Sequence, residues 1–287
     1  MKVLLVPSAN PKTVESARYL RSRLIIAGID TEVQDPEKDD DPVVAVEELA
    51  LVVPMGGDGT FLHAARLIGF ASVPLLAFNY GTLGFLAGNP ERDEVELIAD
   101  ALSGDVVFER RSTLDAEVFD GEGAAHPVTG LNEIVFARGG SGRVVEFTYG
   151  INGTKIAHLK ADGLVISTAT GSTGYALSAG GPIVSPGYKG LVVVPVAPHA
   201  LNTRAIVTGT SDVVEVDIKA ASPGEPAETS VFVDGMDLGV HDASRIVARR
   251  GEHELFFALG GGDFFTNVSR VFFGGPVNGG ADTEEAI

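Results

Sequence analysis

The residues best able to do chemistry form the run Gly56-Gly57-Asp58-Gly59-Thr60. Glycines let backbone N–H groups approach an anion closely, and a helix beginning here would add its positive end. Asp58 is the unusual member, because a carboxylate at a phosphate site repels the ligand unless it binds Mg²⁺ or accepts a proton from an attacking hydroxyl. The run therefore predicts a phosphate-handling site. The alternative is a tight turn in which Asp58 only caps the helix.

A second polar segment is dense in hydroxyls and glycines. Asp162 and Gly163 precede a predicted strand, and the run Thr168-Ala-Thr-Gly-Ser-Thr-Gly-Tyr175 follows it. Such a run before a helix predicts a polar cradle for sugar hydroxyls or phosphate, with Tyr175 offering a ring face and a hydrogen-bond donor. A Ser/Thr-rich capping turn would explain one or two of these residues but not the whole set.

Two shorter motifs could contribute to the same site. The loop 79–86, Asn-Tyr-Gly-Thr-Leu-Gly-Phe-Leu, leaves a predicted strand at the same edge of the sheet. Asn132-Glu133 leads a β segment, and a buried Asn-Glu pair can hold adenine or ribose by paired hydrogen bonds. The alternative for the first motif is an ordinary loop with two turn glycines. The alternative for Asn132-Glu133 is the start of a strand with no binding role.

The elements that must position these motifs alternate between strand and helix over the first hundred residues. Strands are predicted at 2–7, 31–34, 49–55 and 73–78, and helices at 11–27, 61–68 and 92–102. Strands joined by helices imply a parallel sheet with right-handed crossovers. The run Gly56–Thr60 then lies at the carboxyl edge of that sheet, where open α/β sheets bind ligands.

The predicted secondary structure changes near residue 106. Short β-branched or alternating segments follow at 106–110, 114–119, 133–137, 144–150, 164–167, 191–196, 213–218, 230–233 and 245–249. A helix is predicted at 175–179, and the apolar spacing of 263–273 indicates a closing helix. We therefore expect an α/β N-terminal domain with a parallel sheet plus a β-rich C-terminal domain, followed by a Gly-rich and acidic tail.

The charge of the chain excludes several classes of partner. Its 287 residues carry 21 Lys and Arg against 39 Asp and Glu, a net charge of −18. Nucleic acid and anionic membranes are bound through basic patches, so neither is expected as a partner. Because concentrated salt screens self-repulsion, the charge suggests a salt-accumulating source such as a halophilic archaeon; an ordinary acidic cytosolic protein is the alternative. The absence of cysteine excludes disulfides and thiolate chemistry.

Taken together, the motifs resemble the NAD kinase family. The family's Gly-Gly-Asp-Gly-Thr, Asn-x-Gly-x-Leu-Gly-Phe-Leu and Asn-Glu motifs are matched at 56–60, 79–86 and 132–133, and its long Asp-Gly…Gly-Gly-Pro stretch at 162–182. Pro198-His199-Ala200-Leu201 and Asp234-Gly235 match two further segments in the family's order. The first motif is shared with phosphofructokinases and lipid kinases, whereas the 162–182 stretch is specific to NAD kinases. Lys160 stands where many members have Arg.

The resemblance implies a role for each matched position. Asp58 would lie beside the ribose 2′-hydroxyl that receives phosphate, as general base or as a carboxylate that organises a metal ion. The remaining nucleotide-binding positions implied are Gly57, Gly59 and Thr60 at the phosphates, Phe85 in the pocket wall, Asn132, Glu133, Thr170, Thr173 and Tyr175 on the adenosine side, Ser178 near adenine, and Lys160 and Asp162 toward the other end of the dinucleotide.

The resemblance also implies an architecture and a reaction. The domains would be 1–105, 106–250 and a segment 251–287 that returns to the first domain, with the site in the cleft. The enzyme would transfer phosphate from ATP or another polyphosphate donor to NAD, giving NADP, with Mg²⁺ or a similar divalent cation. It would be a cytoplasmic homodimer or homotetramer. A lipid kinase and a non-catalytic dinucleotide-binding regulator are the alternatives.

Overall fold

The N-terminal part is a parallel sheet covered by helices on both faces. The computed structural model describes residues 2–36, 45–80, 85–86, 92–140, 143–219, 229–258 and 264–274. Its first elements are β1 (Lys2–Pro7), α1 (Pro11–Ile26), β2 (Thr31–Val33), the 3₁₀ turn η2 (Val46–Glu48), β3 (Leu49–Gly56), α2 (Asp58–Leu67), β4 (Leu75–Leu76), β5 (Phe78–Asn79) and α3 (Glu94–Ser103). Strands β2, β1, β3 and β4 lie side by side and all run parallel.

The alternation of side chains along β1 explains the two layers of helices. Val3 and Leu5 pack in one buried cluster with Leu20 and Leu24 of α1. Leu4 and Val6 point to the opposite face and share a cluster with Phe61 of α2. Because both faces of the sheet are covered, its strands are almost continuously apolar, as is typical of parallel sheets. The packing of Phe61 against this face holds the start of α2 at the end of β3.

The second half of the chain is β-rich, as predicted. Its elements are β6 (Phe108–Phe119), β7 (Ala125–Gly130), β8 (Glu133–Arg138), β9 (Val145–Ile151), β10 (Thr154–Ala161), β11 (Gly163–Ser167), η3 (Gly171–Thr173), α4 (Tyr175–Ser178), β12 (Val192–Val196), β13 (Ile206–Val207), β14 (Val213–Lys219), β15 (Thr229–Val233), β16 (Met236–Asp237), β17 (Arg245–Ala258) and α5 (Phe264–Phe273). Six of the strands form an antiparallel sheet in the order β13-β12-β11-β8-β15-β16. Its inner face packs on β9, where the rings of Phe136 and Phe147 meet edge to face at 4.9 Å.

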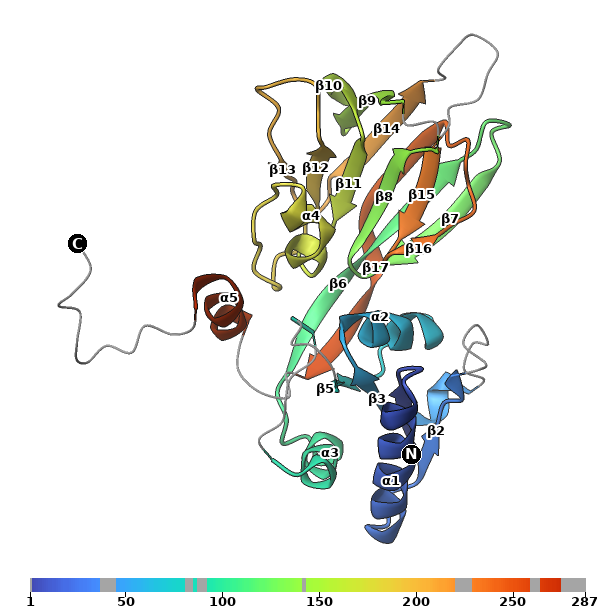
Figure 1. Ribbon diagram of the computed structural model, residues 1–287, viewed down its shortest axis with the longest axis vertical. Coiled ribbons are helices and arrows are strands. Elements are labelled where there is room, and N and C mark those ends of the chain that lie inside the picture. The colour runs from blue at the N-terminus through green and yellow to red at the C-terminus, as the bar shows by residue number, and fades with distance from the viewer. Residues whose placement is uncertain are drawn as a thin grey trace, which may run out of the picture.

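Two long strands connect the halves. Strand β17 pairs with β14 and β6 in the β-rich half and, further along, lies parallel to β4 of the N-terminal sheet. Figure 1 shows β6 and β17 running together from the upper half of the molecule into the lower one. The expected division at residue 250 falls inside β17, so the described strand is continuous across it. The domain boundaries themselves stay a prediction.

Several predicted strands differ from those observed. The single strand expected at 73–78 is two short strands, β4 and β5, because each pairs with a different stretch of β3. The two segments expected at 106–110 and 114–119 form one strand, since β17 pairs along the whole of β6 with one register shift. Strands β7, β10, β13 and β16 were not predicted; most of β10 is exposed and lacks clear alternation. The tail after residue 274 lies outside the described residues.

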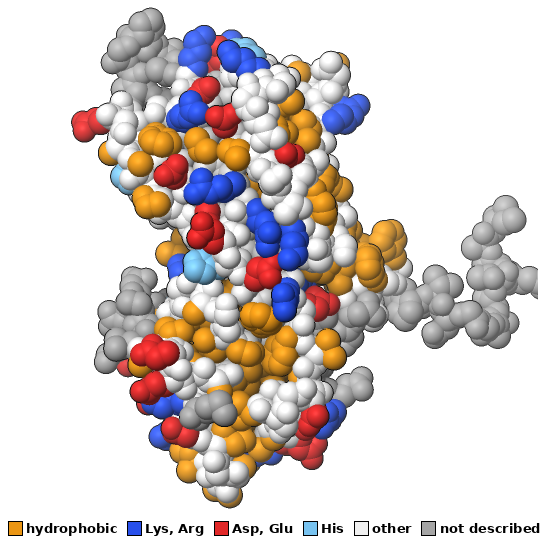
Figure 2. Space-filling view, turned by 180° about the vertical axis from the view of Figure 1, so that it is seen from behind, with side chains coloured by type: hydrophobic (Ala, Val, Ile, Leu, Met, Phe, Trp, Pro, Cys, Tyr) orange, Lys and Arg blue, Asp and Glu red, His pale blue; other side chains and the backbone are white. Residues whose placement is uncertain are grey.

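The surface mixes charges of both signs. Ion pairs such as Lys189–Glu254 at 2.7 Å and Arg245–Glu215 at 3.0 Å place positive groups beside the more numerous carboxylates. On the face seen in Figure 2, Lys and Arg side chains likewise stand among Asp and Glu. No helix among the described residues is long and apolar enough to cross a membrane.

Candidate active site

Asp58 is the first residue of α2, at the carboxyl end of β3. The N-cap of the helix is Gly57, and no side chain caps it, so the interpretation of Asp58 as a helix cap is wrong. The carboxylate instead accepts backbone N–H groups of the 79–86 loop, from Phe85 to Oδ2 and from Leu86 to Oδ1, both at 3.0 Å. Each oxygen retains a lone pair, which leaves Asp58 able to accept a proton or to approach a cation.

The glycines of the run have distinct roles. A Cβ on Gly56 would lie 2.2 Å from Oγ1 of Thr60 and 3.2 Å from Cβ of Ser8, so only glycine allows this approach of strand and helix. A Cβ on Gly57 or Gly59 would meet nothing within 4 Å. These two positions border open space at a helix N-terminus, which suits a phosphate group.

Phe85 connects this turn to helix α5. Its ring stacks on Phe272 of α5, with centroids 5.4 Å apart and ring planes inclined by 23°. The neighbouring Leu86 is buried with Phe61 in the core beneath α2. Residues 81–84 of the same motif lie outside the described residues. The backbone of Phe85 thus lies at Asp58 while its ring contacts α5, and the pocket-wall role that the family resemblance implies for Phe85 stays a prediction.

Asn132 immediately precedes β8, and Glu133 is the first residue of that strand. Leu131, just before them, is fully buried in the cluster that contains Phe61, so this segment of the β-rich half packs on the N-terminal core. Glu133 is 8% exposed. Desolvation, with a smaller contribution from the charge of Asp234, raises the pKa of Glu133 to about 8. Oδ1 of Asn132 and Oε2 of Glu133 are buried, with no hydrogen-bond partner in the described structure.

These two unpartnered oxygens are groups that a bound ligand could satisfy. Buried polar atoms are nearly always hydrogen-bonded, so two adjacent exceptions need an explanation. A protonated carboxyl donates as well as accepts, and an amide oxygen accepts. A Cβ on Gly174 would lie 3.4 Å from Oε2 of Glu133, which shows how closely the 168–175 segment approaches the pair.

The hydroxyl-rich segment is partly structural. Oγ1 of Thr168 donates to the carbonyl of Leu131 at 2.6 Å and accepts the N–H of Gly171, while the hydroxyl of Ser172 donates to the carbonyl of Ala169. Of the predicted site residues here, Thr170 is buried, Thr173 is half-buried and donates to the carbonyl of Thr170, and Tyr175 and Ser178 are exposed around α4. Some hydroxyls therefore build the turn and others remain available to a ligand.

Lys160 and Asp162 lie elsewhere. Asp162 precedes β11 and Thr168 follows it, so at about 3.3 Å per residue roughly 20 Å of strand separates them. Asp162 forms an ion pair with Arg138 at 3.3 Å, and Lys160 forms one with Glu146 at 3.4 Å. The fold thus places these two predicted residues away from the Asn132–Glu133 pair of the same chain.

Asp234 is a site residue that the sequence reasoning did not include. Its carboxylate accepts the backbone N–H groups of Leu131, Asn132 and Glu133 at 2.8, 2.7 and 3.1 Å. The sequence shows Asp234-Gly235 as a matched motif, but it does not show that Asp234 binds the backbone of residues 131–133, which lie far from it in the chain.

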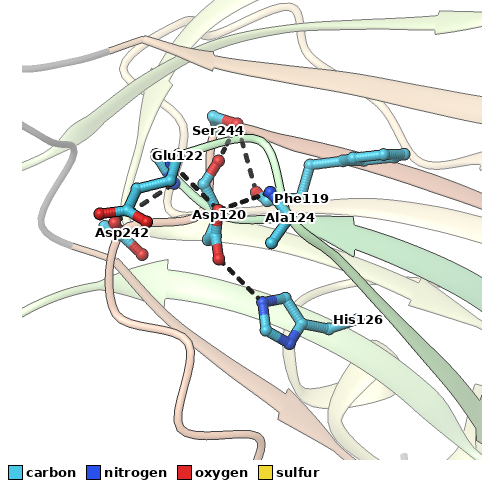
Figure 3. Close-up of polar contacts among 8 residues, drawn as sticks. Phe119, Asp120, Glu122, Ala124, His126, Asp242 and Ser244 are labelled. Atoms are coloured by element: carbon cyan, nitrogen blue, oxygen red, sulfur yellow. Dashed lines mark hydrogen bonds and ion pairs between the residues drawn. The ribbon is translucent and has the colours of Figure 1, made fainter.

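Asp120, His126 and Ser244 are of the residue types found in a hydrolase triad, but their contacts here are structural. The carboxylate of Asp120 accepts the N–H groups of Glu122 and Ala124 and contacts Nε2 of His126 at 3.0 Å (Figure 3). The hydroxyl of Ser244 donates to the main-chain carbonyls of Phe119 and Asp120, not to the histidine. These contacts close the turn between β6 and β7 onto the start of β17.

The described residues contain no group of three His, Cys, Asp or Glu side chains that could hold a metal ion by itself. One carboxylate, that of Asp58, lies at the turn where a phosphate would bind. A Mg²⁺ ion is commonly held by one or two carboxylates plus substrate phosphates. The site therefore fits a cation that arrives with a nucleotide better than a resident one.

The chain thus combines a glycine-aspartate turn after a parallel strand with a buried amide-carboxyl pair at the start of a β-rich unit, and the family models that match it are those of a nucleotide-dependent kinase. Residues 8–106 match the family described as ATP-NAD kinase N-terminal domain, and residues 131–258 match the ATP-NAD kinase C-terminal domain. The chain is 35% identical to the NAD kinase of Lachnoclostridium phytofermentans over 93% of its own length and 90% of that protein. It is 40% identical to the NAD kinase of Nitrosomonas eutropha over 73% and 71% of the two chains.

Solved structures show the same fold. Yeast NADH kinase in complex with NADH superposes with a TM-score of 0.85, covering 99% of this chain and 90% of that one at 22% identity. An NAD kinase from Archaeoglobus fulgidus in complex with ATP gives 0.74, covering 95% and 97% at 21% identity. The chain therefore belongs to the NAD kinase family, and its enzyme class is that of a phosphotransferase with an alcohol group as acceptor. None of these similarities supports a halophilic archaeal source.

Proposed function

We propose that this enzyme transfers the γ-phosphoryl group of ATP to the 2′-hydroxyl of the adenosine ribose of NAD, giving NADP and ADP. The observation that carries the proposal is Asp58 at a glycine turn suited to phosphate, together with the buried unpartnered oxygens of Asn132 and Glu133. Leu131, next to that pair, packs with Phe61 of the helix that Asp58 begins. The family membership of the chain and the ATP and NADH bound in structures of the same fold support it.

Each residue then has a defined part in the transfer. The backbone at Gly57 and Gly59 receives the phosphates, and Asn132 and Glu133 hold the nucleoside of NAD. The 2′-oxygen attacks the γ-phosphorus while its proton passes to the carboxylate of Asp58, and the bond to the β–γ bridging oxygen breaks to release ADP. Such transfers depend on positioning and charge neutralisation more than on covalent catalysis.

A divalent cation forms part of this proposal. The chain has no lysine between Lys38 and Lys155, so few side-chain cations are available to neutralise a triphosphate near the glycine turn. Mg²⁺ would supply that charge, held by the phosphates of the donor and the carboxylate of Asp58. Another polyphosphate donor in place of ATP would bind through the same groups.

The separation of Lys160 and Asp162 from the rest of the site supports a homo-oligomer. If both groups contact NAD, they reach the dinucleotide held by Asn132 and Glu133 more readily from a second copy of the chain. Light scattering coupled to gel filtration tests the dimer or tetramer, and a monomer with full activity would contradict it. Function in high salt and a cytoplasmic location stay predictions from the −18 charge and the lack of cysteine.

One assay tests the proposed reaction. Purified protein incubated with NAD, ATP and Mg²⁺ is expected to form NADP, which glucose-6-phosphate dehydrogenase detects specifically. Replacing NAD with diacylglycerol or sphingosine tests the lipid-kinase alternative. NADP formation with none of the donors ATP, other nucleoside triphosphates and inorganic polyphosphate would reject the proposal and favour a dinucleotide-binding regulator.

A further inference from the structure

Asp234 is hydrogen-bonded through both its backbone and its side chain to the residues at the beginning of β8. It follows β15, which pairs antiparallel with β8, and its backbone has φ +48°, in the left-handed region that Asp and Asn tolerate better than most residues. Its N–H donates to the carbonyl of Glu133 at 3.0 Å. Its side chain turns back and accepts the three successive N–H groups of residues 131–133.

The three N–H groups depend on this carboxylate. Leu131 is fully buried and Glu133 nearly so, so water cannot easily replace a lost acceptor. Hydrogen bonds to an ionised acceptor are roughly twice as strong as those between neutral groups. One side chain from another strand thus fixes the backbone direction of three consecutive residues.

The fixed segment carries the two unpartnered side-chain oxygens. Oδ1 of Asn132 and Oε2 of Glu133 project from the two residues whose N–H groups share Oδ1 of Asp234. The carboxyl groups of Asp234 and Glu133 also interact. Burial raises the pKa of Glu133 most, and the negative charge of Asp234 raises it further. Burial raises the pKa of Asp234, whereas its hydrogen bonds with the N–H groups of residues 131–133 favour the charged carboxylate.

We propose that Asp234 is a positioning residue for NAD, orienting Asn132 and Glu133 through the backbone N–H groups that its carboxylate accepts. The inference rests on the proposed function, because it assumes that the Asn132–Glu133 pair binds NAD. Asp234 itself contacts backbone and neighbouring charges, and its carboxylate oxygens are occupied by N–H donors. Its influence on the reaction passes through the pair.

The variant Asp234→Asn tests the proposal. Asparagine tolerates positive φ and keeps one acceptor oxygen, but it replaces the other oxygen with an amide that cannot accept. We expect the KM for NAD to rise at least about tenfold, from the loss of a charge-assisted hydrogen bond to the pair, while the KM for ATP changes less than about twofold. Removing the neighbouring negative charge should also shift the basic limb of the pH profile of kcat/KM for NAD to lower pH.

The matched control is Asp212→Asn. Asp212 also accepts a backbone N–H, from Gly209, and the side-chain amide of Asn152, but on the turn before β14. We expect unchanged KM values in that variant. Unaltered KM for NAD and pH profile in Asp234→Asn would overturn the proposal, and so would a parallel loss of ATP and NAD binding with a large fall in Tm, because that pattern assigns Asp234 to the general fold. Failure of the wild-type enzyme to form NADP would instead overturn the proposed function.

Discussion

Phe85 donates its backbone N–H to the carboxylate of Asp58 at 3.0 Å, across 27 residues of sequence. The same residue stacks its ring on Phe272 near the end of the described chain. Asp58 is therefore oriented from outside its own turn, by a residue whose ring stacks on helix α5. The carboxylate that the proposed chemistry requires is held before any substrate binds, which lowers the cost of ordering it during the reaction.

Asp58→Asn should lose almost all turnover while NAD still binds. Asparagine keeps the size of the side chain but cannot accept the proton of the 2′-hydroxyl, and general-base catalysis contributes roughly 10²–10⁴-fold. Steady-state NADP formation measures the loss, and calorimetric titration with NAD measures binding. A variant that retains more than about a tenth of the wild-type rate would contradict the base role.

Chelation of divalent cations should abolish turnover. EDTA is expected to stop NADP formation, and added Mg²⁺ to restore it, because the chain has no lysine between Lys38 and Lys155 to neutralise a triphosphate near the glycine turn. Since the described residues contain no three-ligand cluster, Mg²⁺ alone should show no measurable binding in a calorimetric titration, whereas Mg²⁺ with ATP should bind. Turnover that survives chelation would refute the dependence on a cation.

Glu133 should make stability fall as the pH rises. Its pKa is raised from 4.5 to about 8 in the folded protein, so its contribution is fully present below about pH 4.5 and is lost as the pH rises through 8. Relative to wild type, Glu133→Gln should therefore gain stability between pH 5 and pH 8.5, by an amount on the order of a few kcal/mol, since one pKa unit corresponds to about 1.4 kcal/mol.

Urea unfolding of wild type and variant at both pH values measures this gain, and the difference between the proteins cancels the titration of most other groups. Glu117→Gln, on the exposed face of β6, is the control and should show no comparable trend. A stability difference between wild type and Glu133→Gln that does not change with pH would contradict the raised pKa.

Gly171→Ala should disturb the site through the backbone. A Cβ at this position would lie 2.3 Å from the carbonyl oxygen of Asn132 and 2.6 Å from Oγ of Ser167. The Asn132 backbone must move to accept it, at a cost of about 1–3 kcal/mol, and the KM for NAD should rise. Thermal unfolding and NADP formation measure the two effects.

Gly187→Ala is the matched control, because a Cβ there meets nothing within 4 Å and its φ is not in the left-handed region. That variant should keep its KM and change stability by less than about 1 kcal/mol. Equal behaviour of the two variants would show that the approach of Gly171 to Asn132 is not tight.

The sequence by itself determined the elements whose signals are local. The apolar strand before Gly56, the helix after it and the alternation of β segments beyond residue 106 follow from side-chain periodicity, which depends only on near neighbours. The order and spacing of the motifs were sufficient to indicate the family. The identity of Asp58 as the residue of chemical interest also needed no structure, because a carboxylate at a phosphate site repels the ligand unless it binds a cation or accepts a proton.

Only the tertiary structure decided which distant residues meet. Asp58 accepts the N–H of Phe85 rather than capping its own helix, and Asp234 accepts three N–H groups from residues 131–133. Both contacts depend on the packing of elements that lie far apart in the chain, such as the pairing of β15 with β8. Likewise β17 continues past residue 250 because β6 and β4 are there to pair with it. Periodicity reports which face of an element is buried, but hydrogen bonds between elements are fixed only when the whole chain has packed.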